Sequence, residues 1–315
     1  MWFYLAVLLV LYFFRRWYRE RQTVENLTQK YVFITGCDTG FGNLLARQLD
    51  LKGMRVLAAC LTQKGAKELE KATSDRLKTT ILDVTSTESV VAAAEWVKRC
   101  VGDKGLWGVV NNAGIGVPSG LNEWLTKEDF MKILSVNLLG VIDVTLHMLT
   151  LVKRARGRVV NMASMMGRLA LFGGGYCPSK FGVEAFSDSL RREMLSFGVH
   201  VSIVEPGAFR TPIIMTVGDN FKDLWTRLPS DIKVQYGQQY FENYHKKLVE
   251  LLQLGSTNLY LVTDSIEHAL TSCHPRTRYS PGWDAKLFYI PISYLPTTVV
   301  DYILTRLLPK PAQGI

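Results

Sequence analysis

Short aliphatic runs alternate with stretches of helical periodicity from residue 31 to beyond residue 200, and this alternation limits the fold more than any other feature. The expected strands cover residues 31–35, 55–60, 79–84, 107–111, 158–163 and 199–205. Their side chains are apolar along most of each run, which is typical of strands that helices bury on both faces. The pattern predicts an α/β fold with a doubly wound parallel sheet.

One large domain with appendages accounts for the 315 residues, of which 48% are hydrophobic. We expect an N-terminal appendage at residues 1–22, a main domain at residues 29–255 and a C-terminal segment at residues 256–315. From residue 210 to about residue 260, polar and aromatic residues form short helical stretches. Such a region fits an insertion that covers a substrate better than it fits the framework of a sheet.

The N-terminal appendage begins with an uninterrupted apolar and aromatic segment at residues 2–14, and Arg15, Arg16, Arg19 and Arg21 follow it. A cleavable signal peptide has the opposite polarity and a small-residue cleavage site. The segment therefore predicts a membrane anchor with a basic flank. Thirteen helical residues cover only about 20 Å of a ~30 Å hydrocarbon core, so whether the anchor spans the bilayer stays open. If it spans, the positive charges keep the rest of the chain in the cytosol.

The formal net charge of +9 is compatible with an anionic membrane surface, with nucleic acid or with an anionic ligand. The basic cluster directly follows the apolar segment, which favours the membrane surface. No nucleic-acid-binding motif accompanies it, so nucleic acid is not an expected partner.

The C-terminal segment contains a second apolar region at residues 286–308, rich in aromatic and aliphatic residues. Pro291, Pro296, Asp301 and Arg306 interrupt it, which argues against a clean membrane span. We expect it to lie in the membrane interface or to form a flap over an apolar substrate pocket, and these two roles are compatible.

The five cysteines are widely spaced and include no C-x-x-C pair. An odd number without histidines at metal-ligand spacing predicts neither a disulfide framework nor a metal site. We interpret them as reduced thiols, mostly buried.

The first expected strand runs into Thr35-Gly36-Cys37-Asp38-Thr39-Gly40-Phe41-Gly42, and a helical pattern follows. Strand, glycine turn and helix in this order can seat a pyrophosphate on the N-terminus of the helix. The fourth strand ends in Asn111-Asn112-Ala113-Gly114, where side-chain amides can tie neighbouring strands together and the glycine permits close approach of a cofactor. Taken alone, the second motif fits an ordinary turn at the end of a strand better than a cofactor site.

Tyr176 and Lys180 are four residues apart on an expected helix, so they share a face and the ammonium can approach the phenol. A phenol of pKa ~10 must drop about three units to act near neutral pH, and one cation at ~4 Å supplies about that at an effective dielectric constant of 20. Ser164 follows a strand twelve residues before Tyr176, where its hydroxyl can hold a substrate oxygen.

Taken in order, T-G-x-x-x-G-x-G, N-N-A-G, Asn137, Ser164, Y-x-x-x-K and Pro206-Gly207 resemble the short-chain dehydrogenase/reductase superfamily over about residues 29–255. The stretches ITGCDTGFG, GLWGVVNNAG, GGGYCPSK and CHPRTRYSPGWDAK are similar to its microsomal branch of retinol and 3α(17β)-hydroxysteroid dehydrogenases. This second resemblance extends over nearly the whole chain. It implies a Rossmann-type sheet of seven parallel strands and a nicotinamide-dependent alcohol dehydrogenase.

The resemblance also implies a role for each catalytic residue. Tyr176 would take the proton of the alcohol, Ser164 would orient the substrate hydroxyl, Lys180 would lower the pKa of Tyr176 and hold the nicotinamide ribose, and Asn137 would hold a proton-relaying water. Ser164 and Tyr176 are also the expected substrate contacts. The expected cofactor contacts are Gly36, Asp38, Thr39, Gly40, Phe41, Gly42, Asp83, Asn111, Ala113, Gly114, Tyr176, Lys180, Pro206, Gly207 and Thr211.

The cofactor predicted from these residues is NAD, with NADP as the alternative. Asp38 in the glycine turn would repel a 2′-phosphate and could bond ribose hydroxyls, whereas Lys64 argues for the phosphate. The chain departs from the family pattern at Ala163, where many relatives carry serine, and at Cys60, where an NAD enzyme usually places an acid. The second departure weakens the choice of cofactor and leaves the catalytic residues untouched.

The anchor and the aromatic C-terminal segment suit a lipophilic alcohol that partitions from the bilayer. The branch resemblance implies that this alcohol is a retinoid or a steroid. Two alternatives stay open, an NADPH-dependent carbonyl reductase and a non-catalytic, membrane-tethered retinoid or steroid binder. The branch resemblance implies the endoplasmic reticulum membrane, with the catalytic domain in the cytosol. Superfamily members are commonly dimers or tetramers, so a homo-oligomer is a further expectation.

Overall fold

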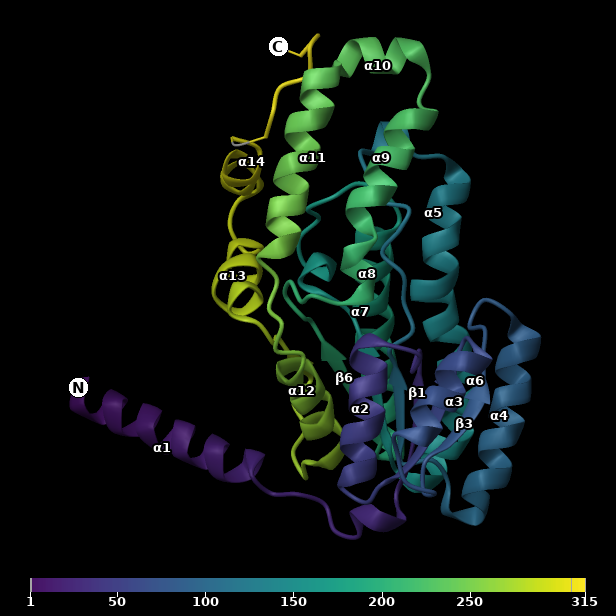
Figure 1. Ribbon diagram of the computed structural model, residues 1–315. Coiled ribbons are helices and arrows are strands. Elements are labelled where there is room, and N and C mark those ends of the chain that lie inside the picture. The colour runs from purple at the N-terminus through teal and green to yellow at the C-terminus, as the bar shows by residue number, and fades with distance from the viewer. Residues whose placement is uncertain (1, 307, 315) are drawn as a thin grey trace.

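A parallel sheet forms the centre of the computed structural model, which describes residues 2–306 and 308–314 (Figure 1). Its strands run in the order β3-β2-β1-β4-β5-β6-β7, and every neighbouring pair is parallel. The strand bounds are β1 Tyr31–Thr35, β2 Arg55–Cys60, β3 Lys78–Ile81, β4 Gly108–Asn111, β5 Arg158–Met162, β6 His200–Val204 and β7 Arg278–Tyr279. The order reverses between β1 and β4, where doubly wound sheets bind their ligands.

The predicted doubly wound sheet is confirmed, with differences of detail at β3 and β7. The third strand ends at Ile81, so Asp83 lies in the loop beyond it. β7 has only two residues, too few to show a periodic pattern, and the resemblance alone implied a seventh strand. Gly53 and Gly198 follow helices with φ of +83° and +69°, a left-handed conformation that glycine adopts readily at helix ends.

Helices cover both faces of the sheet and bury two separate apolar layers (Figure 1). One layer includes residues from α2, Gly40–Leu51, α3, Gln63–Lys71, and α12, Tyr260–Thr271. The other includes residues from α4, Thr87–Val101, α6, Gly140–Ala155, and α7, Tyr176–Met194. α5, Lys127–Leu134, precedes α6 through a π-helical turn at Ser135–Leu139.

A cap of helices stands above the sheet, as expected for residues 210–260 (Figure 1). It contains α8 Pro212–Met215, α9 Val217–Arg227, α10 Ser230–Tyr236 and α11 Gln238–Gln253. Trp124 and Phe221 are 2% and 1% exposed at the centre of an aromatic cluster that joins α9 and α11 to the body. The cap therefore has an apolar core of its own.

The structure places residues 260–279 with the sheet, although the sequence boundary at 255/256 assigned them to the C-terminal segment. Val262, Ile266 and Leu270 of α12 are fully buried in the same apolar layer as α2, and β7 pairs with β6. The segment at the side of the cap begins later, with a π-helical turn at Ala285–Tyr289, α13 Ile290–Ile292 and α14 Thr297–Thr305.

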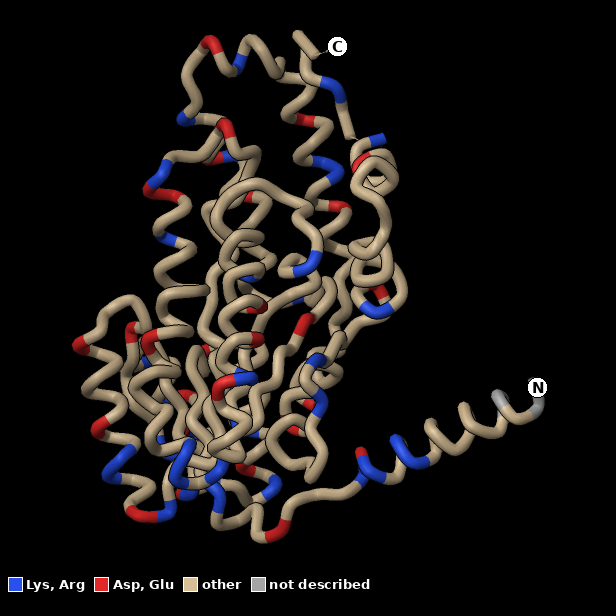
Figure 2. Tube along the Cα trace, turned by 180° about the vertical axis from the view of Figure 1, so that it is seen from behind, with Lys and Arg blue, Asp and Glu red and all other residues tan. Residues whose placement is uncertain are grey.

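The N-terminal helix α1, Trp2–Glu20, projects away from the body (Figure 1). Leu8, Val10 and Phe14 are 64%, 66% and 62% exposed, so the body does not cover this apolar surface. Basic residues follow the apolar part at the end nearest the body (Figure 2). That end is attached to the body, because Arg276 Nε donates to Glu20 Oε1 over 2.8 Å.

Among the described residues, one helical stretch, 127–155, is long and apolar enough to cross a membrane by length and composition. Val144, Met148 and Val152 on this stretch belong to the apolar layer beneath the sheet, and each is at most 1% exposed. Its apolar character is therefore that of a core helix.

Short helical turns complete the chain. The 3-10 turns lie at Leu27–Gln29, Gly102–Lys104, Asn122–Trp124, Met165–Gly167 and Leu195–Phe197. The turn at Met165–Gly167 begins directly after Ser164, which caps it by accepting from Met166 N.

Candidate active site

The glycine turn packs tightly between β1, α2 and the end of β4. A Cβ on Gly42 would lie 2.3 Å from Gly36 O and 2.4 Å from Asn112 Nδ2, and Gly36 itself has a φ of +70°. Gly40, with a φ of +62°, begins α2. The missing side chains let the turn fold over the N-terminus of α2, whose free N–H groups and dipole suit a pyrophosphate.

Asp38 turns toward the loop after β2, where its carboxylate accepts three hydrogen bonds. Leu61 N donates to Oδ2 over 2.7 Å, and Thr62 N and Thr62 Oγ1 donate to Oδ1 over 3.0 and 2.6 Å. The carboxylate is thereby fixed beside a cleft that extends over the carboxyl ends of the strands. Cys60 is fully buried, so Leu61 and Thr62 are the residues of this loop that line the cleft.

The two asparagines at the end of β4 have different roles. Asn111 is 1% exposed and its Nδ2 donates to Asn161 Oδ1 over 2.8 Å, which confirms the predicted tie between strands and turns the side chain into the sheet. Asn112 Nδ2 donates to Thr35 O over 2.9 Å and to Gly36 O over 3.1 Å. Asn112 thus fixes the glycine turn. The sequence motif contains both asparagines and did not indicate that their roles differ.

Tyr176 and Lys180 lie in the first two turns of α7, one turn apart as their spacing predicted, and both line the cleft. The Lys180 Nζ atom lies 5.6 Å from the centroid of the Tyr176 ring and donates to Met162 O over 2.8 Å. Lys180 as a whole residue is 6% exposed, so most of its surroundings are protein.

The pKa values of this pair differ from the sequence expectation. Burial raises the pKa of Tyr176 to about 12, and a hydrogen bond with Ser164 only partly opposes it. Burial also lowers the pKa of Lys180 to about 8, against the charge of Glu184, which raises it. The sequence argument counted the attraction of one cation and omitted desolvation, which is the larger effect on the phenol in this site.

Asn137 is fully buried in the π-helical turn between α5 and α6. Its Oδ1 accepts from Ile115 N over 2.8 Å, and its Nδ2 donates to Ile115 O over 2.9 Å. The amide also donates to Ser179 Oγ over 3.3 Å, one residue before Lys180. Asn137 therefore joins the loop after β4 to helix α7.

Two cavities meet at Ser164 and Tyr176. A cleft of ≈ 420 Å³ extends over the carboxyl ends of the strands, and a smaller, mostly apolar pocket of ≈ 120 Å³ extends beneath the cap. Both are lined by Ser164, Tyr176, Gly207, Ile213 and Ile214. The apolar pocket reaches α9, α11 and the C-terminal segment through Phe221, Leu248 and Tyr289.

Most expected cofactor contacts line the larger cleft: Gly36, Asp38, Thr39, Gly40, Phe41, Asp83, Ala113, Gly114, Tyr176, Lys180, Pro206, Gly207 and Thr211. Gly42 and Asn111 support the cleft from behind through the contacts described above. The glycine turn, the helix N-terminus and the fixed carboxylate together fit a dinucleotide.

Asp284 supports the site, although no sequence motif singled it out as a functional residue. Its Oδ2 accepts from Ala208 N over 2.6 Å, and a Cβ on Gly207 would lie 2.1 Å from its Oδ1. Asp284 thereby holds the loop after β6 against the cleft. It lies in the stretch SPGWDAK, which contributed to the branch resemblance by sequence similarity without indicating a role for any of its residues.

The fold and the paired cavities define a dinucleotide-dependent dehydrogenase, with a serine and a tyrosine between the cofactor cleft and an apolar substrate pocket. A family model described as short chain dehydrogenase matches residues 30–221. The chain belongs to this short-chain dehydrogenase/reductase family, and its cofactor is a nicotinamide dinucleotide.

Individual relatives agree with this assignment. The chain is 63% identical to human 17-beta-hydroxysteroid dehydrogenase type 6 and 61% identical to retinol dehydrogenase 7 of Rattus norvegicus, over 100% of both chains in each case. A solved short chain dehydrogenase/reductase from Burkholderia phymatum, in complex with NAD, has a TM-score of 0.68 at 21% identity. That match covers 90% of this chain and 97% of the other and supports the fold.

Proposed function

We propose that this protein oxidises a lipophilic primary or secondary alcohol with NAD, converting retinol to retinaldehyde, a 3α- or 17β-hydroxysteroid to a ketosteroid, or both. One observation carries the proposal: Ser164 and Tyr176 line both the cofactor cleft and the apolar pocket. An alcohol whose hydrocarbon body fills that pocket would present its hydroxyl to these two side chains. The names of the relatives at 61–63% identity support the two substrate classes.

The chemistry follows from the positions of the side chains. Ser164 would hold the alcohol oxygen by a hydrogen bond, and the Tyr176 oxygen would take the hydroxyl proton as the carbon–hydrogen bond breaks. Lys180 would stabilise the ionised phenol by its charge and hold the nicotinamide ribose, while Asn137 would keep α7 in register with the loop after β4. When bound, oxidised NAD supplies the hydride acceptor and a further positive charge near the phenol.

The preference for NAD over NADP is supported by Asp38. Its three hydrogen bonds fix a negative charge at the side of the cleft formed by Leu61 and Thr62, where a 2′-phosphate would be repelled. Lys64 gives little support to the phosphate, because its side chain is 85% exposed and its ammonium forms an ion pair with Glu68 at 3.9 Å.

A second candidate function is the reverse reaction, an NADPH-dependent reduction of a carbonyl. The observation that favours it is the burial of the Tyr176 phenol, which raises its pKa and keeps the hydroxyl protonated, as a group that gives its proton to a carbonyl oxygen must be at the start of the reaction. Both candidates use the same residues, so the choice of cofactor discriminates between them.

Membrane attachment is part of the proposal. The exposed apolar part of α1 supports anchoring in the microsomal membrane, and the basic residues after it favour a cytosolic catalytic domain. Tyr289 of the C-terminal segment lines the apolar pocket, while Leu287 and Tyr294 beside it are 64% and 71% exposed. A segment of this kind fits a lipid interface through which an apolar alcohol reaches the pocket.

The test is the reduction of NAD and of NADP, followed by absorbance at about 340 nm, in microsomes that contain the full chain. All-trans-retinol and a 3α-hydroxysteroid are the substrates, and Tyr176→Phe is the control. We expect oxidation with NAD that the control abolishes. If the protein reduces a carbonyl with NADPH and does not oxidise either alcohol, the reductase function is established. If the folded protein binds the substrates without turning them over, it is a non-catalytic binder.

A further inference from the structure

Four ionisable side chains stand at four-residue spacing along one face of α7. Tyr176 and Lys180 belong to the site, and Glu184 and Asp188 continue the row away from it. Lys180 and Glu184 are 6% and 7% exposed, so a buried cation and a buried carboxylate lie one helical turn apart. The motif Y-x-x-x-K does not include Glu184, and none of the roles given above uses it.

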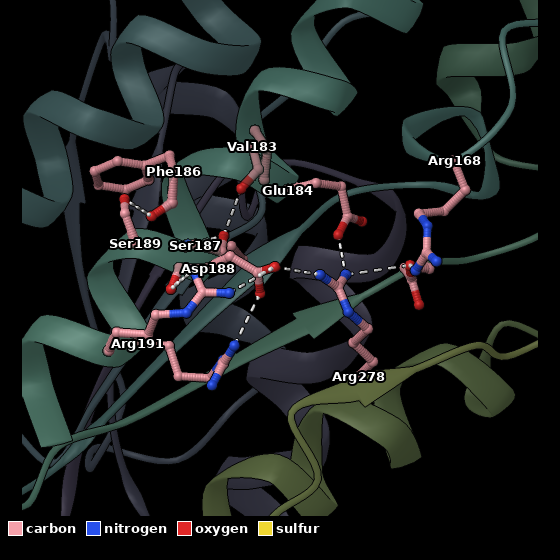
Figure 3. A network of polar contacts seen from close by, with 12 residues as sticks. Arg168, Val183, Glu184, Phe186, Ser187, Asp188, Ser189, Arg191 and Arg278 are labelled. Atoms are coloured by element: carbon pink, nitrogen blue, oxygen red, sulfur yellow. Dashed lines mark hydrogen bonds and ion pairs between the residues drawn. The ribbon is translucent and has the colours of Figure 1, made fainter.

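Arg278 of β7 is the partner that holds Glu184 in place (Figure 3). Its guanidinium donates to Glu184 Oε2, lies 3.0 Å from Asp188 Oδ2 and lies 3.4 Å from Glu205 Oε1. Arg168, just after the Ser164 turn, donates to Glu205 Oε1 over 3.0 Å. The charged groups that face Glu184 are therefore Lys180, Asp188, Arg278, Glu205 and Arg168.

The second oxygen of Glu184 has no partner among the described residues. Oε1 is buried and accepts no hydrogen bond, which leaves one side of a buried carboxylate uncompensated. Burial and the charge of Glu205 raise the pKa of Glu184, and Arg278 and Arg168 lower it. A buried carboxylate costs free energy unless a nearby opposite charge interacts with it.

The nearby group is Lys180. Burial alone drives this amine toward its neutral form, and the charge of Glu184 opposes that effect. We propose that Glu184 is a positioning residue whose carboxylate, held by Arg278, keeps the ammonium of Lys180 charged inside the cofactor cleft. The proposal rests on the proposed function, since it assumes that Lys180 serves the Tyr176 acid/base.

Glu184→Gln is the sharpest test, because the amide keeps the size of the side chain and an oxygen that can accept from Arg278. With the negative charge removed, Lys180 should lose its proton at lower pH. The alkaline limb of the kcat/KM profile should then move down by on the order of one pH unit, with a loss of about tenfold on that limb and little change near pH 6.

Asp188→Asn is the matched control. Asp188 also bonds Arg278, but it lies one turn farther from Lys180 and its side chain is 31% exposed. Its loss should leave the pH profile in place. Glu184→Asp keeps the charge and withdraws it by one methylene, so a smaller shift in the same direction is expected; this variant carries the test if Glu184→Gln does not fold.

A second measurement separates this inference from the proposed function. Pyridoxal 5′-phosphate forms an imine with a neutral amine, and borohydride traps it, so peptide mapping gives the labelling of Lys180 at each pH. The half-labelling pH should fall in Glu184→Gln and stay unchanged in Asp188→Asn. If the wild-type protein is inactive but Glu184→Gln still shifts the labelling, the proposed function is rejected and the role of Glu184 stands. Active wild-type protein, with neither the labelling nor the pH profile moved by Glu184→Gln, would overturn the role of Glu184.

Discussion

Two regions of this protein are held in place in different ways. The cofactor half is the sheet with the loops at the carboxyl ends of its strands, and the cap half is α8–α11 with the aromatic cluster that they enclose. In the cofactor half, backbone and small polar groups are fixed by hydrogen bonds at the ends of parallel strands, as in the contacts of Asp38 and Asn112. In the cap, order comes from contacts between aromatic rings. The centroid of the Phe221 ring lies 5.0 Å from that of Trp124, in a tilted arrangement, and 5.1 Å from that of Tyr244, on which it stacks. Hydrogen bonds fix atoms in direction, whereas ring packing mainly fills volume.

This difference assigns chemistry to one half and substrate fit to the other. A reaction needs its groups aligned within fractions of an ångström, which the strand ends provide. An apolar substrate needs a pocket of suitable shape, which side chains in a separate aromatic core can change without moving the sheet. Ser164 and Tyr176 stand where the two halves meet, so variants of each half should have separable effects.

The largest effect is expected at that meeting point. Ser164→Ala removes the hydroxyl that bonds Tyr176 and lines both cavities, and kcat/KM should fall by about 10²–10³-fold. Steady-state oxidation with NAD measures it. Ser119→Ala is the control, because Ser119 lines only the apolar pocket and donates to Gly116 O over 2.7 Å. A loss at Ser119 as large as that at Ser164 would contradict the assigned roles.

Gly42→Ala should damage the cofactor half alone. The added Cβ would meet Gly36 O at 2.3 Å, so the glycine turn must shift and NAD affinity should fall by about 10²-fold. Fluorescence titration with NADH measures the affinity. Gly218→Ala in the cap is the matched control, since the atoms nearest to its Cβ would be Val249 Cγ2 at 3.3 Å and His245 Nε2 at 3.8 Å, both on side chains. Unchanged NADH affinity in Gly42→Ala would show that the turn does not depend on this glycine.

Phe221→Ala should damage the cap alone. The side chain is 1% exposed among aromatic neighbours, and its removal should lower the free energy of unfolding by about 3–5 kcal/mol. The KM for the alcohol should rise about tenfold while NADH affinity stays unchanged. Thermal unfolding and the two binding measurements check this together. An equal loss of NADH affinity would show that the two halves are coupled rather than separable.

The smallest effect is expected from Asp38→Asn, which removes charge from the cofactor half while keeping its shape. The preference for NAD over NADP should fall by about fivefold to tenfold, measured as the ratio of kcat/KM with the two cofactors. Lys64→Ala should change that ratio less, because Lys64 is exposed and outside the cleft lining. A larger change at Lys64 than at Asp38 would favour NADP as the natural cofactor.

Local patterns in the sequence determined the sheet and the positions of its turns. Continuous apolar runs located six of the strands, and the glycine turn, Ser164 and the Tyr176/Lys180 pair were found because each motif is contiguous and follows an element with its own periodicity. The cap at residues 210–260 was likewise predicted from a change in composition. These features depend on residues that are close together in the chain, so they can be predicted from the sequence alone.

Tertiary packing decided what depends on distant residues. β7 has two residues and forms by pairing with β6, and Arg278 on it reaches Glu184, which is 94 positions away in the chain. The rise in the pKa of Tyr176 could not be foreseen for the same reason, because desolvation depends on everything packed around the phenol. Sequence spacing fixes which groups share a helix face, but burial and long-range partners fix their charge, and those arise only when the chain has folded.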